Sequence, residues 1–460
     1  MNDVHSLLPT NDSERTASAG GVALIWLAAT MTASTLPLGA LLVELFPSAN
    51  FLVVLVLASV FFITVGAISL PGFNLGIPTM AVSSRLYGNK FNRLVSFSNW
   101  LSQVGWQAIV LVLVIYVLRS MLSYLGLVNG SNALGVAIIL GIFANFFIPI
   151  IGYQAIVKAQ SIVSIFMGIF ALYILIKMHG FAQLWERSFN QTSISWIQTF
   201  SALSLALMGG ALSWTMFASD YSRYLNRTSN RLTILIWPTL GGGIGSALIL
   251  SLALVLTFTG GVNLSAGGLE ITAAGMHSPI IYLSFCVFAI LGLLASNFLN
   301  SYSSAFSLAV TLNRDLNRKY VTVIDAILAT LVAIYILFVS PSFFDSFQTF
   351  LDLLIIIAAP WTGIMCSAII FRDLLTPTCK KAQYGRVTIL LIGVFATILF
   401  SNNPLWEGWG AMLLANNDIS PLVGFIIGLF LESARRIAFN IGRDKRARDS
   451  VPAPVMIDHI

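Results

Sequence analysis

WLAATMTASTLPLGAL, residues 26–41, lies inside the first long apolar run of the chain and interrupts it. Hydroxyl residues crowd this stretch, and Pro37 and Gly39 follow them where a plain membrane span would continue with leucine and valine. Proline removes a backbone donor and weakens a helix, and neighbouring hydroxyl groups can bond the carbonyls that are freed. The stretch therefore predicts a membrane helix that is broken in its middle.

A second stretch of the same kind, LMGGALSWTMFASDY, occupies residues 207–221. Gly209 and Gly210 lower the stability of a helix just before Trp214. Transporters often hold their solute at mid-membrane between discontinuous helices in corresponding positions of two repeats. Small residues also permit close packing of membrane helices, so each stretch alone has a structural explanation. Their matched positions, in the first and sixth apolar runs, favour a binding site.

Composition places the whole chain in a membrane. Of its 460 residues, 57% are hydrophobic and 9% are charged, against about 25% charged residues in a typical soluble domain. Only α-helices and closed barrels satisfy their backbone hydrogen bonds in hydrocarbon, and the apolar runs lack the alternation of barrel strands. The sequence predicts an all-α integral membrane protein of about twelve transmembrane helices.

The predicted spans group into two repeats, a first five-helix repeat at residues 21–178 and a second, inverted five-helix repeat at residues 198–371. Two additional helices cover residues 387–432, between a cytoplasmic N-terminal tail (residues 1–20) and a basic cytoplasmic tail (residues 433–460). A major-facilitator protein would instead divide its spans into two equal halves. The individual spans centre on residues 21–46, 50–72, 94–118, 133–156, 160–178, 198–218, 232–258, 279–310, 322–340, 347–371, 387–402 and 410–432.

The basic residues indicate how the chain is oriented. With both termini in the cytoplasm, only Arg119, Lys177 and Arg187 of the 24 lysines and arginines fall outside, as the positive-inside rule requires. The net charge of +6 reflects this topology, because the cations lie in short clusters between apolar runs and not on one soluble face. We expect a multi-pass protein of the inner membrane, surrounded by the lipid bilayer, with no nucleic-acid partner and no obligate protein partner.

Uncharged polar residues mark the third and eighth spans. Asn99, Gln103 and Trp106 follow one another at helical spacing on one face of the third span. Amides and hydroxyls offer donors and acceptors without charge, and indoles offer flat stacking surfaces, so these groups suit a planar, neutral solute. In the eighth span, a polar zipper between helices would explain the same residue types without a ligand. The eighth-span residues are Ser296, Asn297, Asn300, Ser301 and Ser303.

Acidic residues within the spans are candidates for coupling transport to an ion, because a charged carboxylate is costly in the membrane. Asp220 and Asp352 are the two candidates, although a structural pair with an inside arginine such as Arg223 is the favoured explanation of Asp220. His277 could sense pH, but an exposed loop histidine is the simpler interpretation. A lone tryptophan such as Trp100 is expected in the interfacial belt.

Catalytic and metal-binding chemistry has little support in the sequence. No Ser/His/Asp or Cys/His arrangement is evident, and an integral-membrane enzyme, the rival class, would need acids or histidines gathered near one membrane face. The three cysteines lie far apart with no CxxC spacing, so neither a disulfide framework nor a metal site is indicated. We expect a transporter that carries no cofactor.

Five motifs, taken in order, resemble the nucleobase:cation symporter-1 family, especially its purine-cytosine permease branch. WLAATMTASTLPLGAL in the first span, QVGW at residues 103–106 and WTMFASDYSRY at residues 214–224 are similar to patterns of that family. SNFLNSYSSAFSL at residues 296–308 and FLDLLIIIAAPWTGI at residues 350–364 extend the likeness through the eighth and tenth spans. The resemblance implies the five-plus-five inverted-repeat transporter bundle, with two additional C-terminal helices.

The same resemblance implies a function and a binding site. Trp106 and Trp214 would stack on the two faces of a base, and residues of the first and eighth spans would bond its edge. The expected function is import of a nucleobase such as cytosine or a purine by cation symport, and the alternative substrate is another planar heterocycle, such as allantoin, hydantoin or a vitamin pyrimidine. The predicted substrate-binding residues are Ser34, Gln103, Trp106, Trp214, Asn297 and Asn300.

The coupling ion is expected to be the proton, with sodium as the alternative. Sodium-coupled members of the family place two adjacent hydroxyl residues on the eighth span, whereas this chain has Ala295 and Ser296 there. Ser296 is the one side-chain sodium ligand that this position offers. The residues proposed for coupling are therefore Ser296, Asp220 and Asp352.

Overall fold

Helices form almost all of the computed structural model, which describes residues 8–45, 49–151, 153–177, 180–190, 193–258, 262–265, 268–271, 278–375 and 379–449. Within these ranges nine helices are long and apolar enough to cross a membrane, and the bent pair Ala19–Thr30 and Ala33–Val43 makes a tenth span. The predicted fold class is confirmed, while the number of twelve spans stays a prediction. The same holds for the boundaries of the two repeats.

The long helices correspond one by one to predicted spans. They are α3 (Phe51–Val60) with α4 (Ile63–Leu75), α5 (Thr79–Tyr124), α6 (Gly130–Ile151), α7 (Tyr153–Lys177), α12 (Arg231–Phe258), α13 (Pro279–Leu312), α14 (Arg318–Phe338), α15 (Phe343–Ile370), α16 (Lys380–Phe400) and α18 (Ser420–Asp449). The broken first and sixth spans consist of α1 (Ala19–Thr30), η2 (Ala33–Thr35) and α2 (Leu36–Leu45), and of α9 (Trp196–Met208), α10 (Ala211–Thr215) and α11 (Ala218–Ser222). The remaining elements are η1 (Asp12–Glu14), α8 (Gly180–Phe189), η4 (Asp373–Leu375), α17 (Trp409–Leu413) and the hairpins β1 (Val262–Ser265) with β2 (Gly268–Ile271) and β3 (Asn402–Asn403) with β4 (Trp406–Glu407).

The first span is broken between α1 and α2, as the sequence predicted. Met31 and Thr32 leave helical geometry, and the two arms of the span are bent by 42°. The Thr30 hydroxyl donates to the Trp26 carbonyl at 2.8 Å, which bonds a carbonyl of the last turn of α1. Pro37 is not the cause of the break. It lies in the first turn of α2, where a missing N–H costs no helical hydrogen bond.

The sixth span is broken twice, where the sequence predicted one break. The first break falls at Gly209 and Gly210, and Gly210 has φ −116° and ψ −124°. A Cβ on Gly210 would lie 2.6 Å from the Ala206 carbonyl oxygen, so only glycine fits this turn. The second break, at Met216 and Phe217, separates α10 from α11. No proline or glycine marks that position, which is why the sequence did not reveal it.

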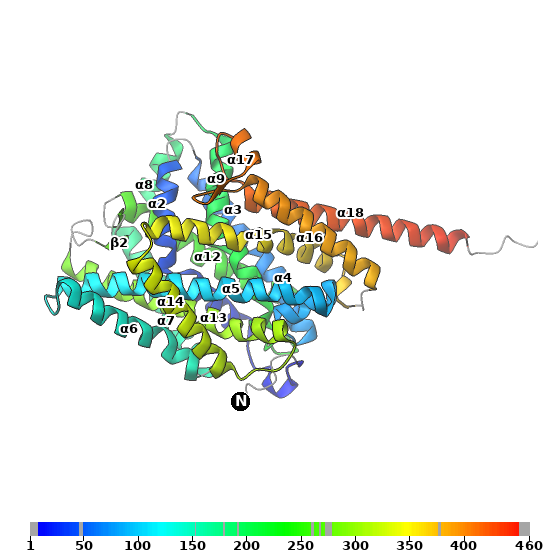
Figure 1. The fold of residues 1–460 in the computed structure, drawn as a ribbon, viewed down its shortest axis with the longest axis horizontal. Helices are drawn as coiled ribbons and strands as arrows, with labels where there is room; N and C mark the ends of the chain where they lie inside the picture. Colours follow the sequence, from blue (N-terminus) through cyan, green and yellow to red (C-terminus); the bar gives the residue numbers. More distant parts are fainter. Residues whose placement is uncertain are drawn as a thin grey trace, which may run out of the picture.

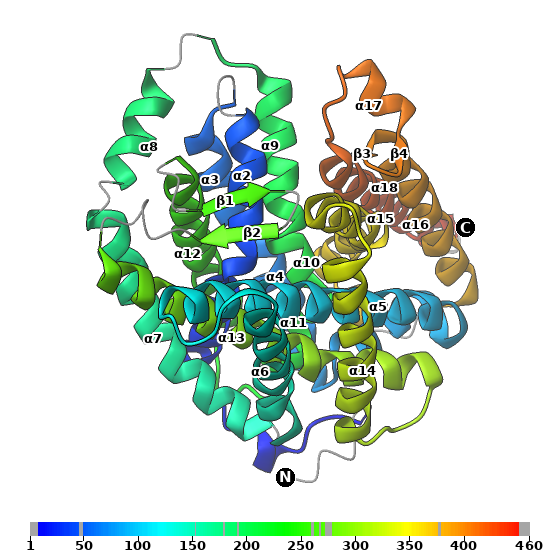
Figure 2. The same ribbon diagram turned by 60° about the vertical axis from the view of Figure 1, so that its left-hand side comes forward.

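The helices pack in groups around the two broken spans. α12 packs against α1, α2 and α4, while α5 packs against α13, α14 and α6. Figure 1 shows α5 crossing the middle of the molecule, with α13 and α14 beside it. α15 packs against α16 and α18 and also contacts α5 and α10. The hairpin of β1 and β2 lies against α2, α12 and α5 (Figure 2).

The N-terminal segment is ordered against the bundle over its described residues, although the sequence predicted a plain tail at residues 1–20. Arg15 is 3% exposed and donates to the Phe73 carbonyl at the end of α4 at 2.8 Å. Thr10 bonds the Gly76 carbonyl through its backbone N–H at 2.8 Å and accepts a hydrogen bond from Arg223 at 2.6 Å. The segment therefore ties the end of α4 to the residues that follow α11.

A buried ionic cluster joins the last three long helices. Asp373, after α15, pairs with Arg386 of α16 and Arg436 of α18. Arg386 also donates to Glu432 at 2.8 Å, and Glu432 in turn bonds Arg435 at 2.6 Å. Burial raises the pKa of the Asp373 carboxyl, and the guanidinium of Arg386 opposes this effect. Each buried charge in the cluster thus has an opposite partner, as burial requires.

The last long helix begins later and ends later than the predicted last span, residues 410–432. α18 begins at Ser420, because Ala415 and Asn416 adopt left-handed conformations that end the short helix α17. It continues to Asp449 and projects beyond the bundle (Figure 1). The predicted basic tail, residues 433–460, is therefore helical as far as residue 449, and residues 450–460 lie outside the described ranges.

Close packing of α12 on α1 leads to a stability prediction. A Cβ on Gly241 would overlap the backbone of Ala23, whereas a Cβ on Gly135, an exposed glycine of α6, meets nothing within 4 Å. Gly241→Ala should therefore lower the free energy of unfolding by about 1–3 kcal/mol through overpacking. Gly135→Ala should leave it unchanged or raise it by up to about 1 kcal/mol, the helix-propensity gain. Thermal unfolding in detergent measures both, and equal melting temperatures for the two variants would contradict the close crossing.

Candidate functional site

A small cavity lies where the two broken spans meet α5 and α13. Its volume is about 10 Å³, enough for a single water molecule. The first break, α5, the sixth span and α13 all contribute to its walls. The lining residues are Thr32, Ser34, Trp106, Gly209, Ser213, Trp214, Phe217, Ser296 and Asn300. Five of the residues predicted for substrate binding or coupling are thereby brought together: Ser34, Trp106, Trp214, Ser296 and Asn300.

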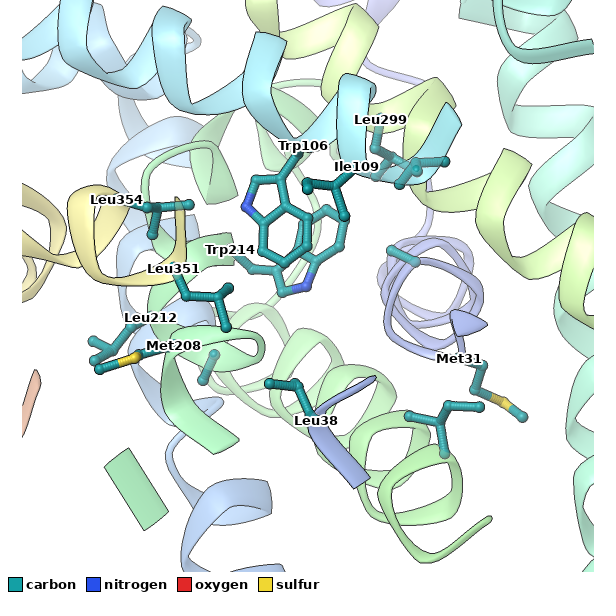
Figure 3. Packing of buried hydrophobic residues seen from close by; sticks show 14 of the residues in the cluster. Met31, Leu38, Trp106, Ile109, Met208, Leu212, Trp214, Leu299, Leu351 and Leu354 are labelled. Atoms are coloured by element: carbon teal, nitrogen blue, oxygen red, sulfur yellow. The ribbon is translucent and has the colours of Figure 1, made fainter. Parts of the chain in front are cut away.

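Two indoles from different helices, Trp106 and Trp214, line this cavity. Figure 3 shows both among the buried hydrophobic residues around them. Trp106 of α5 packs edge-on against Phe350 of α15, with ring centroids 5.2 Å apart. Trp214 of α10 packs edge-on against Trp26 of α1 at 5.7 Å and against Phe217 at 5.1 Å. Edge-to-face arrangement is a favourable geometry for aromatic pairs. The aromatic neighbours thus hold both rings in place.

The polar part of the lining comes from neutral groups. The Ser34 hydroxyl donates to Thr32 Oγ1 at 3.2 Å, and the Ser213 hydroxyl donates to the Gly210 carbonyl at 2.8 Å. Asn300 is 3% exposed and presents an amide to the cavity. An amide both donates and accepts hydrogen bonds. Such a lining would suit a neutral solute with donors and acceptors on its edge.

Two predicted binding residues lie outside the lining of the cavity. Asn297 donates through Nδ2 to the Asn145 carbonyl of α6 at 3.1 Å. Gln103 donates through Nε2 to the Ser307 hydroxyl of α13 at 3.3 Å, and Asn99 donates to the same hydroxyl at 2.9 Å. These bonds join helices to one another. The zipper interpretation therefore fits Asn297 and Gln103, while Asn300 faces the cavity.

Two hydroxyl oxygens lie close together at the first break. Ser296 Oγ lies 3.3 Å from Thr32 Oγ1, and it also donates to the Leu293 carbonyl at 3.0 Å. The sequence indicated one hydroxyl from α13, and the structure adds a second hydroxyl from the first span. Hard cations such as sodium take oxygen ligands, so this pair is a candidate cation position. Within the described ranges, no three His, Cys, Asp or Glu side chains come together to hold a metal ion.

The two acids proposed for coupling lie apart from the cavity lining. Asp220, 2% exposed, accepts hydrogen bonds from the backbone N–H and the hydroxyl of Thr79 at 2.7 and 2.9 Å. Asp352, in α15, lies close to Asp418, the residue two positions before α18. Burial raises the pKa of the Asp418 carboxyl. His277, considered as a pH sensor, lies outside the described residues.

A further buried acid, Asp325 of α14, went unnoticed in the sequence. Its carboxylate accepts a hydrogen bond from Trp100 Nε1 at 3.0 Å. Trp100 is 9% exposed, so the expected position in the interfacial belt is wrong. The signal was present in the sequence, because Asp325 is the single acidic residue of the apolar run at residues 321–338. An acid inside a span is a functional candidate by default.

Two broken spans that enclose an aromatic and polar cavity beside continuous helices define a secondary transporter and not an enzyme. The chain belongs to the family of permeases for cytosine/purines, uracil, thiamine and allantoin, whose model matches residues 9–375. The purine-cytosine permease FCY21 of Saccharomyces cerevisiae is 25% identical over 467 aligned residues, which cover 94% of this chain and 84% of the yeast protein. The resemblance found in the sequence motifs is confirmed.

Solved structures share the fold at low identity. Mhp1, a nucleobase-cation-symport-1 family transporter, in a closed conformation with bromovinylhydantoin bound, matches with a TM-score of 0.69 and 15% identity over 95% of this chain and 96% of that chain. The inward-facing conformation of Mhp1 matches with a TM-score of 0.63 and 15% identity, over 95% and 94% of the two chains. A sodium-coupled sialic acid symporter matches with a TM-score of 0.57 and 15% identity, over 93% and 91%.

The different surroundings of Asn297 and Asn300 lead to a prediction on specificity. Asn300→Ala should change the ranking of purines, pyrimidines and hydantoins as competitors of uptake, because a site that bonds a substrate edge discriminates through its own amides. Asn297→Ala should leave the ranking intact and lower stability by about 1 kcal/mol, the typical value of one hydrogen bond. Competition assays and thermal unfolding measure the two effects. A uniform loss of all substrates in Asn300→Ala, or a new ranking in Asn297→Ala, would contradict this assignment.

Proposed function

We propose that this permease imports a nucleobase such as cytosine or a purine by cation symport, across the inner membrane and with both termini in the cytoplasm. The observation that carries the proposal is the joint lining of one cavity by Trp106, Trp214, Ser34 and Asn300. A planar base presents two flat faces and a polar edge. Indoles match the faces, and an amide and hydroxyls match the edge.

Substrate entry requires the cavity to expand, because a base is several times larger than the single water that fits there now. Alternating access supplies that expansion when one group of helices rocks against another around a fixed site. Trp214 belongs to the sixth span beside α1, and Trp106 belongs to α5 beside α13. Relative motion of these groups would separate the two indoles. Phe350 of α15 packs on Trp106, so a shift of α15 would also affect that indole.

Another planar heterocycle is the second candidate substrate. The family description includes thiamine and allantoin, and the hydantoin in Mhp1 occupies a transporter of the same fold. A panel that contains cytosine, adenine, hypoxanthine, allantoin, a hydantoin and thiamine separates the candidates. Uptake in a host that lacks its own permeases, together with thermal shifts of the purified protein, identifies the substrate. Accumulation of allantoin or a hydantoin, with no response to any base, would overturn the nucleobase proposal.

The proposed coupling ion is the proton. Ala295 supplies no hydroxyl beside Ser296, while buried carboxyl groups such as those of Asp220 and Asp352 are available to bind protons. The closeness of Thr32 and Ser296 favours sodium as the second candidate, because it supplies two side-chain oxygens in one place.

Stacking between the indoles leads to a prediction on affinity. Trp106→Ala and Trp214→Ala should each weaken substrate binding by about 1–3 kcal/mol, the value of one aromatic ring stacked on a base. Trp237→Ala is the matched control, because Trp237 lies on α12 and is 42% exposed; it should bind normally. Isothermal titration of purified protein measures the affinities. Wild-type affinity in both site variants, at normal membrane levels, would contradict stacking of the substrate between Trp106 and Trp214.

The coupling proposal predicts which gradient drives accumulation. Proteoliposomes should concentrate labelled cytosine, or the best substrate of the panel, when the outside is made acidic at equal sodium on both sides. A protonophore should abolish this accumulation, because it dissipates the driving gradient. If an inward sodium gradient alone drives accumulation and a pH gradient does not, sodium is the coupling ion and the pair Thr32 and Ser296 is the first place to seek its ligands.

A further inference from the structure

Asp325 is a buried carboxylate that bonds two of the helices lining the substrate site, α5 and α13. Its exposed fraction is 0%. One oxygen accepts from Trp100 Nε1 of α5 at 3.0 Å, and the other accepts from Gln107 Nε2 of α5 at 3.4 Å and from the Ser304 hydroxyl of α13 at 2.5 Å. The carboxylate thus links α14 to α5 and α13 through three hydrogen bonds.

The groups recorded around this carboxylate are neutral. α14 packs against α5, α6, α13 and α15, and the bonds to Asp325 come from Trp100, Gln107 and Ser304. On α14 itself, Arg318 lies seven residues earlier and donates to the Pro149 carbonyl of α6. Two effects therefore oppose each other at Asp325. Burial without a counter-charge penalises the ionised form, while three donors stabilise it. A carboxylate balanced in this way can gain or lose a proton.

The neighbourhood can also accept the protonated form. Protonation turns one acceptor oxygen into a donor, which then needs an acceptor. Gln107 is fully buried, and its Oε1 has no hydrogen-bond partner among the described residues. A turn of this amide would present Oε1 to the proton on Asp325. Gln107 Oε1 is therefore available to accept a hydrogen bond from the protonated carboxyl group of Asp325.

Two of the residues that bond Asp325, Gln107 and Ser304, lie close in sequence to residues that line the cavity. Gln107 directly follows Trp106, which lines the cavity, and Ser304 lies one helical turn after Asn300, which lines it too. A rearrangement of the Asp325 hydrogen bonds would act on α5 and α13 at the positions beside the site. The Ser303 hydroxyl of α13 also lies beside Asp220, but the α5 residue that bonds Asp220 is Thr79, the first residue of that helix. Asp325 is the acid that is bonded from both α5 and α13 by residues close to the cavity lining.

We infer that Asp325 is the proton-binding site of this symporter, loaded on the outside together with substrate and emptied on the inside. The inference rests on the proposed proton coupling and names the residue that carries it out. The step is a simple exchange: a proton from water on one side binds a carboxylate oxygen of Asp325, and it returns to water on the other side. Asp325 positions Gln107 and Ser304 and through them affects the helices that hold the substrate.

Asp325→Asn tests the inference, because asparagine is neutral at every pH and close to aspartic acid in size. In proteoliposomes, accumulation of labelled cytosine, or of the best substrate of the panel, under a pH gradient should fall by about tenfold or more. Exchange of internal for external substrate at equal pH needs no net proton movement and should stay within about twofold of wild type. Asp345→Asn, at an exposed position of α15, is the control and should keep both activities.

A second measurement covers the case in which the asparagine variant is inactive in both assays. Asp325→Glu keeps a carboxyl group at a shifted position, so it should retain pH-driven accumulation with a displaced pH profile of substrate binding. Accumulation by Asp325→Asn at the wild-type level would overturn the inference, and so would Asp325→Glu with an unshifted pH profile or without activity. If a sodium gradient drives accumulation by the wild-type protein and a pH gradient does not, the proposed proton coupling is wrong, and the assignment of Asp325 is wrong with it. If the pH gradient drives accumulation by both the wild-type protein and Asp325→Asn, proton coupling stands and only the assignment of the proton site to Asp325 is wrong.

Discussion

The structure depends on one constraint: a backbone that leaves helical geometry inside a membrane must find hydrogen-bond partners within the protein, because hydrocarbon offers none. The broken spans meet this requirement with short side chains. Thr30 bonds the Trp26 carbonyl before the first break, and Ser213 and Thr215 bond the carbonyls of Gly210 and Leu212 around the sixth-span breaks. The breaks in turn create the polar surface from which the cavity is built.

Aromatic contacts fix the two indoles that line the cavity. Trp214 is held by Trp26 from the first span, so the two broken spans support each other. Trp106 stands on α5, packed against Phe350 of α15. The indoles therefore belong to different helices, and the proposed motion between these helices would change the space between the rings. A nearly filled cavity and a changeable separation are the properties that alternating access requires.

Buried charges fall into two kinds, and the difference bears on function. Asp373, Arg386 and Glu432 form a cluster in which each charge has an opposite partner, which fastens α15, α16 and α18 together. Asp325 has neutral hydrogen-bond donors and lies between the helices of the site. A charge that is paired with an opposite one is fixed, whereas a carboxylate held by neutral donors can exchange a proton. The first kind stabilises the fold, and the second kind is suited to coupling.

The sequence by itself determined the membrane class, the position of most spans and the break in the first span. These features follow from local properties: apolar length, helix-weakening residues and the cost of polar groups in lipid. Tertiary structure alone decided that Asn300 faces the cavity while Asn297 bonds α6, because helix rotation sets which of two residues three positions apart points inward. It also decided that Asp325 meets Trp100, a partner 225 positions away in the chain. Such pairings depend on which helices pack together, and no local pattern of the sequence encodes them.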